Sequence, residues 1–84
     1  MTISLGNDHF GFSMKNDVLE ILKDLNCEVN DHGCHSESPV DFPDIARQVC
    51  EDIQSGRATR GIMICGTGVG ASIAANKFTG IRAA

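Results

Sequence analysis

The sequence has few basic residues and no long apolar run, and its N-terminus shows no basic segment followed by an apolar one. Seven Lys and Arg are scattered among eleven Asp and Glu, which gives a net charge of −4. A surface for nucleic acid or for an anionic membrane is therefore not expected. No stretch approaches the roughly 20 apolar residues that a transmembrane helix needs, and no secretory signal is visible. We expect a cytoplasmic chain whose four cysteines are reduced thiols.

Low-complexity segments, internal repeats and linkers are also missing from the sequence. Its 84 residues, 42% of them hydrophobic, are enough for one small domain over residues 1–84. A chain of this length buries only about 60–65% of its unfolded surface. We therefore expect a domain that is marginally stable without a partner.

Strand and helix patterns alternate along the chain. In order, we expect a strand at 2–6, a helix from Met14, a strand at 27–31, a loop at 32–40, a helix from Pro43, a strand at 61–65, a helix after the glycines at 66–70, and the start of a fourth strand at 80–84. Such alternation predicts an α/β fold with a parallel sheet and helices on its faces. With strand 2–6 in the centre, its carboxyl end adjoins that of strand 61–65, where ligands of open α/β sheets bind.

The helical patterns predict which residues face the sheet. In the first helix these are Met14, Val18, Ile21, Leu22 and Leu25, and in the second they are Ile45, Ala46, Val49, Cys50 and Ile53. Lys15 and Lys77 are interpreted as surface charges.

Two loops meet at that edge of the sheet, "GNDHFG" (6–11) and "CGTGVG" (65–70). The glycines let the backbone approach a ligand closely, and the helix that follows begins with amides that have no partner within it. These features predict an anion site, although a plain tight turn is the alternative. The run also matches G-x-G-x-x-A, a dinucleotide fingerprint, but as a lone match this is weak.

Cys65 lies beside this helix N-terminus, which favours its thiolate. It is a candidate nucleophile or base; the alternative is a small buried hydrophobic residue at a strand end. Asp8 and His9 end the first strand and are candidate site residues, unless they make only a hydrogen bond within the loop. The other cysteines (27, 34 and 50) are interpreted as packing or loop residues. His32, Cys34 and His35 match no common zinc pattern, so a solvated loop is expected there.

The segments "GNDHFGFSMK", "DHG", "VDFPDIA" and "GIMICGTGVGASIAANKFTGIRAA" together resemble the type B ribose-5-phosphate isomerases and the related galactose-6-phosphate isomerase subunits. The resemblance runs over nearly the whole chain in the same order. It implies a Rossmann-like, three-layer α/β/α fold, a dimer or dimer of dimers with a site shared across subunits, and no metal or organic cofactor.

The same resemblance implies a reaction and its residues. The reaction is aldose–ketose isomerisation of a sugar phosphate through a cis-enediolate, with Cys65 as the base that moves the proton between C1 and C2. Asp8 and His9 match a pair that contacts the sugar hydroxyls. The loop that holds the enediolate oxygen matches Gly66, Thr67, Gly68, Val69 and Gly70, with a hydroxyl added by Thr67.

The chain departs from the family pattern in three places. Phe42 stands where the family has tyrosine, and Asn7 where a small residue is more common. The family also continues well beyond residue 84, with a ring-opening histidine and phosphate-binding arginines that have no counterpart here. We therefore expect a fold truncated after about the fourth strand, with little or no activity alone. A phosphate- or nucleotide-binding module, or a partner subunit to a complete isomerase, is the alternative, and the sequence does not choose among ribose, allose and galactose phosphates.

Overall fold

The computed structural model describes residues 1–9, 11–33, 42–66 and 68–84. Strands and helices alternate in this part of the chain: β1 (Thr2–Asn7), α1 (Phe12–Asp24), β2 (Glu28–Asp31), α2 (Phe42–Gln54), β3 (Arg60–Ile64) and α3 (Val69–Asn76). Each follows the predicted order, and α2 begins with Phe42 and Pro43, where proline costs no helical hydrogen bond. None of the described helices is long and apolar enough to cross a membrane.

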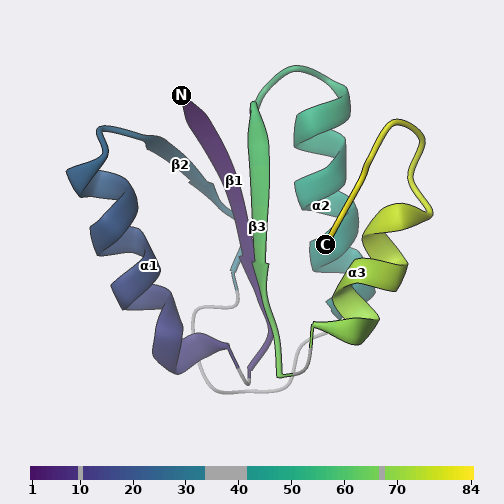
Figure 1. The fold of residues 1–84 in the computed structure, drawn as a ribbon, viewed down its shortest axis with the longest axis horizontal. Helices are drawn as coiled ribbons and strands as arrows, with labels where there is room; N and C mark the ends of the chain where they lie inside the picture. Colours follow the sequence, from purple (N-terminus) through teal and green to yellow (C-terminus); the bar gives the residue numbers. More distant parts are fainter. Residues whose placement is uncertain (10, 34–41, 67) are drawn as a thin grey trace.

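The strands form a parallel sheet in the order β2-β1-β3. Asn7, the last residue of β1, is paired with Ile64, the last residue of β3. Helix α1 covers one face of the sheet, and α2 with α3 covers the other (Figure 1). The predicted α/β/α architecture and the central position of the first strand are confirmed, so the loops after β1 and β3 leave the sheet side by side.

Helix α2 lies very close to the sheet because two strand residues are glycines. A Cβ at Gly6 would come within 2.5 Å of the Ile45 side chain, and one at Gly61 within 2.7 Å of the Val49 side chain. Ile45 and Val49 are buried, as predicted, together with Ala46 and Cys50. This tight α2–sheet contact is the core that holds the ends of β1 and β3 in place.

The predicted fourth strand at 80–84 is wrong for this structure. Gly80 has a φ of +79°, which turns the chain, and residues 81–84 belong to no strand in the part of the chain described. The Asn76 side chain occupies both backbone groups of Ala83: its Oδ1 accepts the N–H at 2.9 Å and its Nδ2 donates to the carbonyl at 3.1 Å. Those groups are therefore not available to a ladder, and a cavity of about 460 Å³ lies between this segment, β3, α2 and α3.

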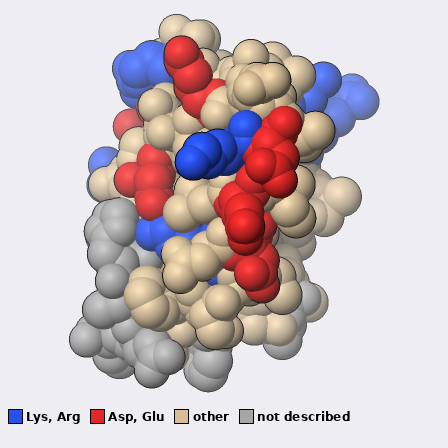
Figure 2. Space-filling view, turned by 90° about the vertical axis from the view of Figure 1, so that its left-hand side faces the viewer, with Lys and Arg blue, Asp and Glu red and all other residues tan. Residues whose placement is uncertain are grey.

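The predicted inner face of α1 is also partly wrong. Met14, Ile21 and Leu25 are exposed, whereas Lys15 and Leu22 are buried. Apolar residues of this helix lie on more than one side of it, so the sheet covers one side and the other remains exposed to solvent. Figure 2 shows this face of the molecule, on which acidic side chains form a row.

Lys15 is not a surface charge, because its ammonium is buried and lies 2.8 Å from a carboxylate oxygen of Asp31 at the end of β2.

Candidate active site

The loop after β1 is bonded directly to the end of β3. The N–H of Asp8 donates to the carbonyl of Ile64 at 3.1 Å, one residue before Cys65. Gly11 passes so near the same carbonyl that a Cβ there would come within 2.5 Å of its oxygen. The structure thus brings together the two predicted loops, and it requires a glycine where they touch.

Asp8 and His9 are both half-buried in this loop. The Asp8 carboxylate accepts the N–H of Gly11 at 2.9 Å, while the buried Asn7 side chain donates to the carbonyl of Asp8 at 3.1 Å. The carboxylate therefore stabilises the turn into α1. The Asn7 side chain stabilises the loop from within.

Cys65 follows β3 and is half-buried. Its Sγ accepts a hydrogen bond from the N–H of Gly68 at 2.9 Å. Gly68 is the N-cap of α3 with a left-handed φ of +79°, a conformation that glycine adopts without a Cβ penalty. The sulfur is thus held against the amino end of a helix, where an amide hydrogen and the helix dipole both stabilise negative charge.

The other predicted loop residues follow Cys65 in the chain. Gly66, Gly68, Val69 and Gly70 are exposed to solvent, and Thr67 lies outside the described residues. A Cβ at Gly70 would meet nothing within 4 Å. Exposed backbone at a helix start is able to approach an anionic group.

Sequence reasoning missed the contribution of Asn7, Gly11 and Ile64 to the site. Ile64 and Gly11 act through the backbone contact between the two loops, and Asn7 acts through its side-chain hydrogen bond to the Asp8 carbonyl. The one available signal was the second glycine of "GNDHFG".

The other reactive side chains of the described residues lie elsewhere. Cys50 is buried between α2 and α3, and burial raises the pKa of its thiol. Cys27 lies before β2, and Cys34 and His35 fall outside the described residues. Within the ranges that the structure covers, no group of three His, Cys, Asp or Glu side chains is arranged to hold a metal ion.

Comparison with known proteins places nearly the whole chain in the family that the sequence motifs resemble. The family model described as Ribose/Galactose Isomerase matches residues 3–84. Ribose-5-phosphate isomerase B of Escherichia coli is 48% identical over 81 residues, which are 96% of this chain and 54% of that protein. The galactose-6-phosphate isomerase subunit LacB of Clostridium acetobutylicum is 40% identical over 84 residues, which are 100% of this chain and 49% of LacB.

A solved structure agrees with the fold. The ribose-5-phosphate isomerase B of Clostridium thermocellum superposes with a TM-score of 0.93 at 49% identity, over 98% of this chain and 55% of that one. The chain spans about half the length of the curated relatives it matches.

Proposed function

The chain belongs to the ribose/galactose isomerase family, and from that premise we propose that it carries one half of the active site of a sugar-phosphate aldose–ketose isomerase. Cys65 acts as the base, and the loop after it stabilises the charge that forms. Ribose 5-phosphate, converted to ribulose 5-phosphate, is the first substrate to test, because the relatives named above include a ribose-5-phosphate isomerase.

The proposed step moves one proton between neighbouring carbons. The Cys65 thiolate takes the proton from C2 of the open-chain aldose, the C–H electron pair forms the C1–C2 double bond, and negative charge passes to O1. The thiol then returns the proton to C1 while the O2 hydroxyl proton moves to O1, which yields the 2-ketose. A base of this kind contributes about 10²–10⁴-fold to the rate.

The observation that carries the proposal is the hydrogen bond from the Gly68 N–H to the Cys65 sulfur. It stabilises the thiolate that must accept the proton. Once the sulfur is protonated it becomes a weaker acceptor, and the same N–H can turn to the charged enediolate oxygen. The amides of Gly66, just before this turn, and of Val69 and Gly70, in the first turn of α3, would share that role. One such donor is worth about 3–4 kcal/mol.

Asp8 and His9 would hold the sugar. Their loop is joined to the residue before Cys65 by the Asp8–Ile64 backbone hydrogen bond, so a sugar bound to them is held near the base. Thr67 would supply a hydroxyl to the same oxygens.

A second candidate function is binding without turnover. The chain would hold a phosphate or nucleotide at the glycine loop, or complete another chain as its partner subunit. One observation favours it: a relative that this chain matches over its whole length is itself named as a subunit.

The test begins with measurements that need no complete turnover. Ribose 5-phosphate should protect Cys65 from iodoacetamide, with Cys27, which is also half-buried, as the internal control. In D₂O the substrate C2 proton should exchange for deuterium, as followed by NMR. Cys65→Ala should abolish this exchange and leave ligand affinity unchanged, whereas Cys27→Ala should change neither.

The outcomes separate the two candidate functions. Protection of Cys65 without C2 exchange would support the binding module. No protection by ribose 5-phosphate, with protection by inorganic phosphate, would contradict the sugar-phosphate assignment.

We also propose that the chain is cytoplasmic and works as a dimer or tetramer. Large apolar side chains are exposed on two of the described helices: Met14, Ile21 and Leu25 on α1, and Val69 and Ile73 on α3. Light scattering after size exclusion should give a mass of at least twice 9.0 kDa. A monomer at 100 μM would contradict the proposal.

A further inference from the structure

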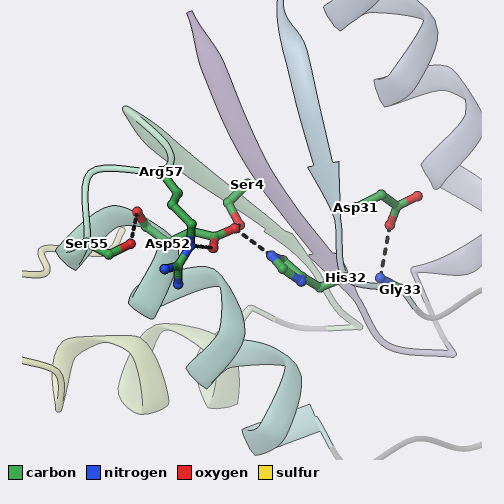
Figure 3. Close-up of polar contacts among 7 residues, drawn as sticks. All are labelled: Ser4, Asp31, His32, Gly33, Asp52, Ser55 and Arg57. Carbon is green, nitrogen blue, oxygen red and sulfur yellow. Dashed lines mark hydrogen bonds and ion pairs between the residues drawn. The ribbon is translucent and has the colours of Figure 1, made fainter.

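Asp52 carries a buried carboxylate on the inner side of α2, with 6% of its side chain exposed. It accepts hydrogen bonds from the Ser4 hydroxyl at 2.8 Å, from His32 Nε2 at 2.6 Å and from Arg57 Nε at 3.0 Å (Figure 3). Ser4 belongs to β1, His32 follows β2, and Arg57 precedes β3. One carboxylate therefore links all three strands of the sheet.

This arrangement determines which way the histidine hydrogen bond points. Burial by itself would raise the pKa of Asp52, but the hydrogen bonds from His32, Arg57 and Ser4 outweigh it and lower the pKa from 3.8 to about 2. The carboxylate is thus ionised at neutral pH and can only accept. His32 must therefore carry a hydrogen on Nε2 and donate it to Asp52.

The His32 segment in turn holds the end of β1. The backbone N–H of His32 donates to the carbonyl of Leu5 at 2.9 Å, and the carbonyl of Gly33 accepts the N–H of Asn7 at 2.6 Å. Asn7 is the residue before Asp8. The position of residues 32 and 33 is therefore passed directly to the loop that contains the proposed sugar-binding pair.

The other side of the same segment is fastened by Asp31. Its carboxylate lies 2.8 Å from the Lys15 ammonium and accepts the N–H of Gly33 at 2.9 Å. Both contacts reach α1 or the segment's own backbone, whereas His32 joins the segment to α2.

We infer that His32 and Asp52 are a positioning pair for the candidate active site. Their hydrogen bond holds residues 31–33 against the end of β1, so that the Gly33 carbonyl sets the position of the Asn7 amide and of Asp8 beside the Cys65 loop. The effect of the pair on backbone position is independent of the proposed function, whereas its effect on sugar binding rests on that function.

Two substitutions of His32 separate positioning from bulk stability. In His32→Gln the side-chain amide reaches the place of Nε2 and still donates to Asp52, whereas in the shorter His32→Asn it reaches only the place of Nδ1. The readout is the hydrogen–deuterium exchange rate of the Asn7 amide in the whole 84-residue chain, measured by NMR. The reference is the Thr59 amide, which donates to the Thr2 carbonyl at the opposite end of β1.

In His32→Asn we expect the Asn7 amide to exchange about tenfold faster or more, relative to the Thr59 amide, because a hydrogen bond to a charged group is lost. His32→Gln should stay within about twofold of the wild type. Asp52→Leu, which removes both acceptor oxygens, should behave as His32→Asn does. Glu51→Gln, which removes an exposed carboxylate at the preceding position of α2, should have no effect.

Equal Asn7 rates in His32→Gln and His32→Asn, or an increase matched by Thr59, would overturn the inference. The effect on sugar binding is measured separately, as the ribose 5-phosphate concentration that halves the rate at which iodoacetamide alkylates Cys65. It should rise at least about threefold in His32→Asn but not in His32→Gln, since a shifted Asp8 binds the sugar less well. Absence of protection in the wild type would contradict the proposed function and leave the exchange result to decide the positioning role.

Discussion

Replacing Asp52 by asparagine should lower the stability of this protein and change how that stability depends on pH. The substitution keeps the shape of the side chain. It removes the negative charge of the carboxylate that accepts hydrogen bonds from Ser4, His32 and Arg57. A buried donor whose acceptor loses its charge is left with the cost of its desolvation. His32 is half-buried, so it would bear most of that cost.

The pKa of Asp52 gives the size of the effect. It lies at about 2 in the folded protein against 3.8 for a free carboxyl, and one pKa unit corresponds to about 1.4 kcal/mol. The ionised form therefore contributes about 2 kcal/mol to the free energy of unfolding. Because the folded pKa is depressed, this contribution is fully present above about pH 4 and disappears as the pH falls towards 2.

Urea unfolding followed by circular dichroism, at steps from pH 7 to pH 2.5, measures this directly. Asp52→Asn should unfold with about 2 kcal/mol less free energy at pH 7, and the gap to the wild type should close as the pH falls below 4. Glu51→Gln, an exposed neighbour on the same helix, should lie within about 0.5 kcal/mol of the wild type. A gap for Asp52→Asn that is constant with pH, or no larger than that of Glu51→Gln, would refute the argument.

The two loops of the site lead to further predictions. Gly11→Ala should cost about 2 kcal/mol or more in urea unfolding, because its Cβ would come within 2.5 Å of the Ile64 carbonyl oxygen, a backbone atom that cannot rotate away; a loss under 0.5 kcal/mol would show that the loops separate easily. Gly68→Ala should cost about 1–2 kcal/mol for its left-handed φ and slow the alkylation of Cys65 by iodoacetamide. Gly70 is helical, and a Cβ there would lie in open space, so Gly70→Ala should be neutral or slightly stabilising and leave the alkylation rate unchanged. Equal alkylation rates in the two variants would contradict the role of the Gly68 amide.

The comparison of sequence with structure is most instructive where helices meet the sheet. Apolar spacing identified the buried residues of α2 because Ile45, Val49 and Cys50 recur at the helical period on one side. The same rule failed for α1, where Met14, Ile21 and Leu25 are exposed. Spacing shows that residues share a side, but it does not show which side the sheet will cover.

The burial of charged residues could not be predicted from the sequence for a related reason. Lys15 and Asp52 are buried because each meets a polar partner from a segment distant in sequence, Asp31 for the first and His32 for the second. No local pattern encodes such a meeting. Residues 80–84 were predicted to begin a strand, yet the Asn76 side chain binds Ala83 instead.

The sequence by itself determined the alternation of strands and helices, the central place of the first strand, and the family, since these depend on local periodicity, crossover rules and a long glycine motif. It also determined that Asp8 and Cys65 stand at neighbouring strand ends, because parallel strands present their carboxyl ends at one edge. Only the tertiary structure decided how those ends are held. The Asp8–Ile64 hydrogen bond, the close passage of Gly11 and the link from Asp52 through His32 to Asn7 all join residues 20 or more positions apart, and such contacts form only when the whole sheet is assembled.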